Sequence, residues 1–265
     1  MRTKLLLLAL SALLLVGCQA KPKGVVSSEG PAEAGSSFQP EPPPQPKTAQ
    51  ELLEEQPIDD THDAFLVDTG GRMGTLLVTA ELGTERGEFD AAMNLFVWNS
   101  ADMSQPLQTI ETRTAAFHWS EAVDANFDGY QDFGYMYAMG NQPTYWQFWI
   151  WEEETGQFVL EPELSEISSP VFDVEAEEIR GWARESAASD GVNTIHKWVD
   201  GELVCVRRIA VYKTDGWEGP FALVVQDRVD GGLTEVFRTE FPAGSDGYFE
   251  ERLKWEDLDY HGETE

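Results

Sequence analysis

The sequence predicts an all-β domain, and three observations support that prediction. Apolar and polar residues alternate with a period of two through most of the chain after residue 60. The alternating runs are rich in Val, Thr, Phe, Tyr and Trp, which favour strands. Turn signals separate the runs at short intervals, and Asp200-Gly201 is a two-residue hairpin dipeptide. Many short antiparallel strands fit either a small β-propeller or a β-sandwich.

The first seventeen residues have the pattern of a signal peptide that is removed at a cysteine. Arg2 and Lys4 supply positive charge, and the apolar run Leu5–Val16 is too short to span a bilayer. The run ends in Leu-Val-Gly-Cys, a lipobox, so we expect cleavage before Cys18 and a lipid on its thiol. The next residue is not Asp, which favours the outer membrane, facing the periplasm. In a one-membrane cell the anchor would hold the protein at the cell surface.

Residues 18–60 are predicted to form a disordered tether. The stretch from Gln19 to Asp60 holds eight of the fourteen prolines and almost no aromatic residues. It therefore cannot bury enough apolar surface to offset chain entropy. A short helix is expected over Gln50–Glu55. All nine tryptophans follow the tether, which leaves residues 61–265 to form one β domain with a sizeable core.

Ten strands are expected in this domain, and no amphipathic helix longer than two turns. They are Gly74–Leu82, Met93–Asn99, Pro106–Glu111, Phe133–Met139, Tyr145–Trp151, Glu178–Glu185, Val192–Val199, Leu203–Lys213, Phe221–Asp227 and Thr234–Phe241. The run Tyr145–Trp151 is apolar on both faces, which predicts a central strand buried on both sides. The alternative is an exposed aromatic platform that binds sugar rings or a partner.

Cysteine chemistry is expected to be limited. The chain has two cysteines, and lipidation of Cys18 leaves Cys205 without a partner for an intramolecular disulfide. Strict alternation places Cys205 on the same strand face as Ile209 and Val211. This position predicts a buried, unreactive thiol.

The most specific motif is the loop of residues 124–132, which reads Asp-Ala-Asn-Phe-Asp-Gly-Tyr-Gln-Asp. Side-chain oxygens recur at positions one, three, five and nine, and a glycine stands at position six, where the turn is sharp. Calcium prefers hard oxygen ligands, so we predict weak calcium binding, with a dissociation constant of about 10⁻⁴ to 10⁻³ M. The predicted ligands are Asp124, Asn126, Asp128, the carbonyl of Tyr130 and Asp132. The flanks, 116–119 and 133–136, read as strands, so the loop is not an EF-hand. The alternative is a solvated turn without metal.

The charge of the domain restricts its partners. Residues 61–265 contain 40 Asp and Glu against 13 Lys and Arg, a net charge of −27. Nucleic acid and anionic lipid are therefore poor partners, whereas a basic protein or a metal cation is favoured.

The sequence offers little for catalysis. It contains no Gly-x-Ser-x-Gly elbow and no phosphate-binding glycine loop, and no two of His62, His118, His196 and His261 have metal-ligand spacing. We therefore expect no enzymatic activity. A glycan-active enzyme that uses a pair of carboxylates is the less favoured alternative.

One family shares several of these motifs. The relevant residues are the 124–132 loop, Gly140-Asn141, Tyr145, Trp146, Trp149, Thr155-Gly156-x-Phe158, Leu164-Ser165 and Pro170-x-Phe172-Asp173. This set resembles a group of bacterial lipoproteins that includes the calcium-binding immunity protein of the Xanthomonas antibacterial type IV secretion system, which neutralises a lysozyme-like effector. The group is similar in fold to periplasmic lysozyme inhibitors. The resemblance covers roughly Phe65 to Lys213 and implies a small β-propeller-like domain with one calcium ion.

Together these patterns predict a lipid-anchored, calcium-binding envelope protein that binds a partner protein or glycan. In its most specific form, the function is inhibition of, or immunity to, a lysozyme-like peptidoglycan hydrolase. The alternative is a structural or solute-binding envelope lipoprotein with no hydrolase partner.

Overall fold

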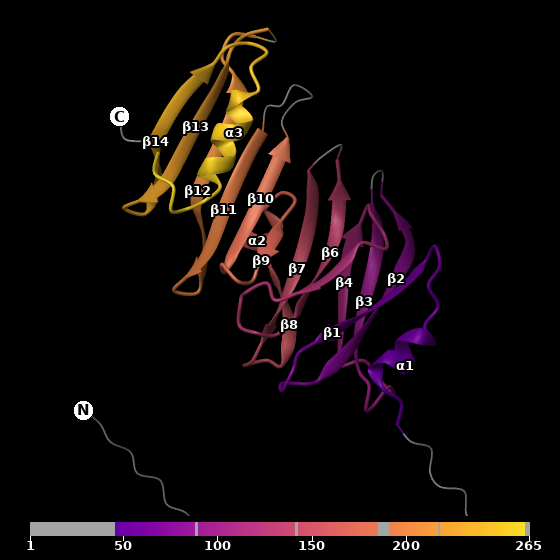
Figure 1. Ribbon diagram of the computed structural model, residues 1–265. Coiled ribbons are helices and arrows are strands. Elements are labelled where there is room, and N and C mark those ends of the chain that lie inside the picture. Colours follow the sequence, from indigo (N-terminus) through magenta and orange to yellow (C-terminus); the bar gives the residue numbers. More distant parts are fainter. Residues whose placement is uncertain (1–45, 88–89, 141–142, 185–190, 217, 263–265) are drawn as a thin grey trace, which may run out of the picture. The chain divides into compact units, whose positions relative to one another are not determined.

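The computed structural model describes residues 46–87, 90–140, 143–184, 191–216 and 218–262. These belong to a compact unit that extends from Gln45 to Glu265. The predicted signal peptide, Cys18 and most of the predicted tether lie outside the described residues. The unit consists mainly of antiparallel strands in three sheets, which confirms the all-β prediction (Figure 1).

Each sheet is an antiparallel meander, in which strands that follow one another in the chain lie side by side. Sheet A contains β1 (His62–Asp68), β2 (Thr75–Arg86), β3 (Ala91–Asn99) and β4 (Gln108–Thr114). Sheet B contains β5 (Ser120–Val123), β6 (Asp132–Met139), β7 (Thr144–Glu152) and β8 (Gln157–Glu161). Sheet C contains β9 (Val171–Asp173), β10 (Glu178–Arg184), β11 (Gly191–Val199), β12 (Glu202–Lys213), β13 (Phe221–Val229) and β14 (Gly232–Phe241).

The more detailed fold predictions are not confirmed. A propeller typically repeats four-stranded sheets four to eight times around a centre, whereas the described residues form two four-stranded sheets and one six-stranded sheet. The sheets do not close into a barrel, and three sheets also differ from the two of a sandwich. The predicted turn at Asp200-Gly201 is present, since both residues have positive φ angles, of 52° and 84°, which a two-residue hairpin requires.

Three short helices accompany the sheets in the described part of the chain. Helix α1 (Ala49–Glu54) begins with a capping box in which Thr48 and Glu51 each bond the other's backbone amide. It confirms the helix expected at Gln50–Glu55, and it buries Ala49 and Leu52. The last part of the predicted tether therefore belongs to the compact unit. None of the described helices is long and apolar enough to cross a membrane.

Strand β7 is buried on both faces, as predicted. Trp149 and Trp151 belong to the core cluster that joins sheets A and B. Phe148 belongs to a second cluster that reaches sheet C, and Trp146 and Ile150 pack against it. Because β7 lies between β6 and β8, its backbone bonds are also satisfied on both sides. The aromatic run therefore forms core, not an exposed platform.

Helix α3 (Gly247–Trp255) covers one face of sheet C and was not predicted. Its residues Tyr248 and Trp255 are buried against β12 and β13. A buried arginine of β12, Arg207, fixes the end of the helix. Its guanidinium bonds both carboxylate oxygens of Asp227, at 2.6 and 2.8 Å, and the carbonyls of Trp255 and Asp257, at 3.1 and 2.7 Å. The C-terminal segment is thus tied to the sheet by a charged network.

A β-bulge corrects the predicted orientation of Cys205. Ile195 pairs with Arg207, but the next residue of β11, His196, pairs with Cys205, so one residue of β12 is skipped. The shift turns Cys205 to the face opposite Ile209 and Val211, which pack in the core cluster under α3. The prediction of a shared face was therefore wrong, because strict alternation does not hold across a bulge.

Candidate functional site

The predicted calcium loop connects β5 to β6 in a hairpin. Val123, the last residue of β5, pairs with Asp132, the first residue of β6. A strand follows the loop, as expected, but the strand before it begins only at Ser120, because residues 116–119 form turns instead of the predicted strand. Phe127 and Gly129 have φ angles of 59° and 89°. These left-handed residues wind the loop back on itself.

The winding brings three side chains of the loop together. The Asp124 carboxylate accepts hydrogen bonds from the amides of Asp128 and Gly129, at 3.0 and 2.8 Å. The Asn126 side chain accepts from the Asp128 amide at 3.2 Å and donates to the Asp128 carboxylate at 2.9 Å. The oxygens of Asp124, Asn126 and Asp128 thus gather at one place, as the sequence spacing predicts.

A distant arginine lies against the loop. The guanidinium of Arg72, from the β1–β2 turn, bonds the two oxygens of Asp128 at 3.0 and 3.4 Å and forms an ion pair with Glu153 of the β7–β8 turn. It also lies 3.9 Å from the centre of the Tyr130 ring. The ring packs on Gly70, where a Cβ would meet it at 2.8 Å. Three turns, from sheets A and B, therefore meet at Arg72.

Asp132 has a different environment from the other acids of the loop. Its side chain is 1% exposed, and its two oxygens accept from the amides of Trp151, at 2.9 Å, and Ala125, at 3.2 Å. Burial raises the pKa of Asp132 to about 7, and the nearby charges of Asp128 and Asp124 add to the rise. Asp132 therefore anchors the base of the loop from inside the protein.

The residues of the loop suit calcium in kind, because all the candidate donors are hard oxygens. However, two of the predicted ligands already have other partners in the structure. Asp128 is already paired with Arg72, and Asp132 is held by two amides. Within the described ranges, no group of three or more His, Cys, Asp or Glu side chains is placed to hold a metal ion. Calcium would thus compete with Arg72 for the Asp128 carboxylate.

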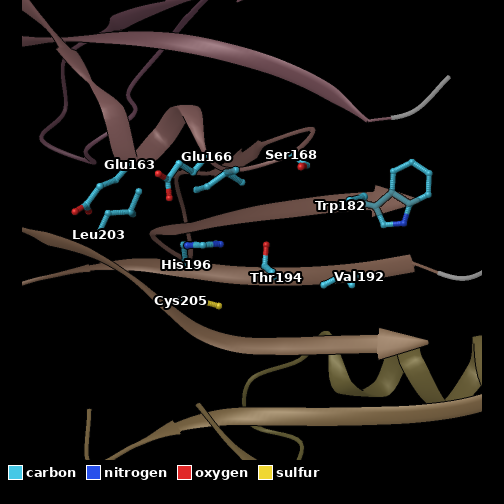
Figure 2. A pocket seen from close by; sticks show the side chains of 11 residues that line it. Glu163, Glu166, Ser168, Trp182, Val192, Thr194, His196, Leu203 and Cys205 are labelled. Carbon is cyan, nitrogen blue, oxygen red and sulfur yellow. The ribbon is translucent and has the colours of Figure 1, made fainter. Parts of the chain in front are cut away.

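A cavity of about 430 Å³ lies between helix α2 (Pro162–Ser165), the residues after it, and one face of sheet C (Figure 2). Figure 2 shows Glu163 and Glu166 on the side of α2, with Thr194, His196 and Cys205 on the strands opposite and Trp182 at one end. The volume is within the range of small-ligand sites. No sequence motif indicated this cavity, since its lining comes from four separate segments.

The two titratable groups on the floor of the cavity are both neutral at physiological pH. Burial lowers the pKa of His196 to about 4, so the imidazole is uncharged. Burial also raises the pKa of the Cys205 thiol, against the nearby charge of Arg208. Cys205 is only partly buried and lines a cavity instead of packing in the core, so the predicted burial is not confirmed and the low reactivity of the thiol stays a prediction.

Comparisons with known proteins give one structural likeness. No protein-family model matches this chain, and no curated protein matches it. A solved structure described as a Xanthomonas type IV secretion system related protein is similar with a TM-score of 0.46 and 15% sequence identity. The match covers 70% of this chain and 95% of that chain.

Proposed function

We propose that this chain is a lipid-anchored, calcium-binding protein of the bacterial envelope that binds a basic partner protein. The observation that supports this most is the acidic end of sheets A and B. We define the acidic rim as Asp124, Asp128 and the segment Glu152-Glu153-Glu154, of which Asp128 and Glu153 form ion pairs with Arg72. Five carboxylates stand there against one guanidinium, and the three glutamates of the segment are exposed.

Calcium would bind at this rim through the side chains of Asp124, Asn126 and Asp128 and the carbonyl of Tyr130. Bound calcium would supply positive charge that neutralises the loop and would stabilise the folded state. Arg72 supplies part of that charge in its present position, so it opposes calcium binding at Asp128. The proposed ion would therefore bind weakly, as expected from the sequence.

The partner that fits best is a basic peptidoglycan hydrolase. The net charge of −27 over residues 61–265 would attract a cationic enzyme, and this attraction weakens as salt rises. The predicted lipid anchor and tether would place the domain near the cell wall, where such enzymes act. The resemblance carried by the 124–132 loop and the aromatic motifs supports the same partner class. The mechanism would be occlusion of the enzyme's cleft by loops of the rim.

The test is a turbidity assay of peptidoglycan lysis by a panel of hydrolases, with and without the full chain. Inhibition should be saturable, near-stoichiometric and weakened by high salt. A triple variant of the rim, in which Glu152, Glu153 and Glu154 become Gln, should inhibit less. A control triple variant, with Glu202, Glu240 and Glu250 changed to Gln, removes the same charge from exposed positions elsewhere.

The outcomes separate the parts of the proposal. Equal loss of inhibition in both triple variants would mean that total charge matters and the rim does not. If micromolar protein slows no hydrolase in the panel, inhibition should be abandoned as the function. Calcium binding is tested separately, by isothermal titration of the wild-type chain and the Asp128→Ala variant.

A further inference from the structure

We propose that the cavity between α2 and sheet C binds a small organic cation with an apolar body. This site is separate from the acidic rim, since none of its lining residues belongs to the rim. The inference therefore goes beyond the proposed function and does not depend on calcium or on a hydrolase.

The first argument is the construction of the cavity. Its walls belong to different elements: Glu163 and Ile167 come from α2 and the residues after it, whereas Trp182, His196 and Leu203 come from three strands of sheet C. Ile167 is buried against the core, and the amide of Trp182 donates to the carbonyl of Ser168 at 2.7 Å. The walls are thus fixed by the fold, so the cavity is preformed, as small-ligand sites usually are.

The second argument is charge. The charged side chains of the lining are Glu163 and Glu166, because the imidazole of His196 is neutral. Both glutamates are exposed, and among the described residues neither carboxylate has a cationic partner. Figure 2 shows both on the α2 side of the cavity. Because Arg208 and Arg228 act on Cys205 at the floor, the charged end of a cationic ligand would lie on the α2 side, beside the two carboxylates, and its apolar body would lie on the floor. An anionic group beside the carboxylates would be repelled.

The third argument is the rest of the lining. Ile167, Leu203 and Val192 provide apolar surface, whereas the ring of Trp182, which pairs with Asn193, lies on the side of sheet C that faces α3. No residue that the structure describes forms a hydrogen bond with the His196 side chain, so the neutral imidazole is free to donate to a ligand or accept from it. Together these groups select an amphipathic cation over a fully polar one.

The experiment uses the only thiol of the cavity as a reporter. In the full chain carrying Cys18→Ser, Cys205 is the sole cysteine, and a ligand in the cavity would shield it from alkylation. The rate of reaction with iodoacetamide is followed by mass spectrometry at alkaline pH, where part of the Cys205 thiol is ionised despite its raised pKa, in the presence of three probes of similar size. They are benzyltrimethylammonium, benzyl alcohol and phenylacetate, which are cationic, neutral and anionic.

The expected result is saturable protection of Cys205 by benzyltrimethylammonium, weaker protection by benzyl alcohol and none by phenylacetate. The double variant Glu163→Gln with Glu166→Gln should weaken binding of the cation by about two- to fivefold for each lost carboxylate, the scale of an exposed ion pair. It should leave the affinity for benzyl alcohol unchanged. The control double variant, Glu240→Gln with Glu250→Gln, should behave like the wild-type chain.

Three results would overturn the inference. One is the absence of saturable protection by the cation at millimolar concentration. Another is equal protection by all three probes, which would remove the role of charge. The third is equal weakening in the cavity variant and the control variant, which would assign the effect to the net charge of the protein.

Discussion

Replacing Arg207 by Met would remove the charged network that ties the C-terminal segment to sheet C. The side chain of Arg207 is 2% exposed, and it forms four hydrogen bonds, two with the Asp227 carboxylate and two with the carbonyls of Trp255 and Asp257. Methionine keeps the apolar stem that packs near the Trp255 ring, so the substitution tests the charge and hydrogen bonds more than the packing.

The size of the effect follows from what the substitution leaves behind. Asp227 would keep its charge with no cation beside it, and two carbonyls would lose a donor. Removing one partner of a buried ion pair costs about 3–5 kcal/mol of unfolding free energy. The Asp227 side chain is 21% exposed, so water offsets part of the loss, and we expect about 3 kcal/mol.

Urea and thermal unfolding of the full chain would measure this loss. A unit of this size shifts its melting temperature by about 2–4 °C per kcal/mol, so we expect a decrease of roughly 10 °C. The matched control is Arg208→Met. Arg208 is the next residue of β12, on the other face, and it bonds only the neutral side chain of Gln226, at 3.2 Å, among the described residues. If Arg207→Met and Arg208→Met differ by less than about 1 kcal/mol, the reasoning from the buried network fails.

Three further predictions follow from the loop, the cavity and the lipobox. Calcium at about 100 times its dissociation constant should stabilise the fold by about 2.7 kcal/mol. In thermal melts, Asp128→Ala should abolish this stabilisation and Arg72→Gln should increase it. Identical melting curves of the wild-type chain with calcium and with chelator would mean that the loop is a turn without metal. Because burial lowers the pKa of His196 from 6.5 to about 4, the unfolded chain takes up this proton first, so stability should fall as pH drops from about 6.5 to 4, by at most about 3 kcal/mol. In His196→Gln, the unfolding free energy measured by urea unfolding should depend less on pH over this range. An unchanged slope in that variant would mean that protonation of His196 does not cause the loss of stability. Finally, Cys18→Ala should leave an unprocessed or soluble precursor outside the detergent phase, and normal partitioning of that variant would refute lipid attachment.

Several features of the fold could be predicted because their causes are local. Period-two alternation depends only on neighbouring residues, so long strands such as β12 were predicted almost to their ends. The Asp200-Gly201 hairpin depends on two residues that tolerate positive φ. The doubly apolar run in β7 predicts burial on both faces, since no other position in a sheet would hide it from water.

Helix α3 was missed because its sequence does not show the pattern of its burial. It buries Tyr248 and Trp255, which are seven residues apart, but exposes Phe249 and Leu253. Apolar residues therefore do not mark one face of the helix. Strands β1, β5, β8 and β9 were missed for a related reason, because partners in the sheet define them more than their own residues do.

The sequence by itself determined the class of the fold, the long strands, the tight turns and the gathering of Asp124, Asn126 and Asp128, since each depends on residues close together in the chain. Tertiary structure alone decided that Arg72 pairs with Asp128, 56 residues away, because only the packing of sheets A and B brings their turns together. It also decided that Cys205 faces a cavity. One skipped residue in the pairing of β11 with β12 reverses the face of every residue beyond it, and no local pattern records where the pairing slips.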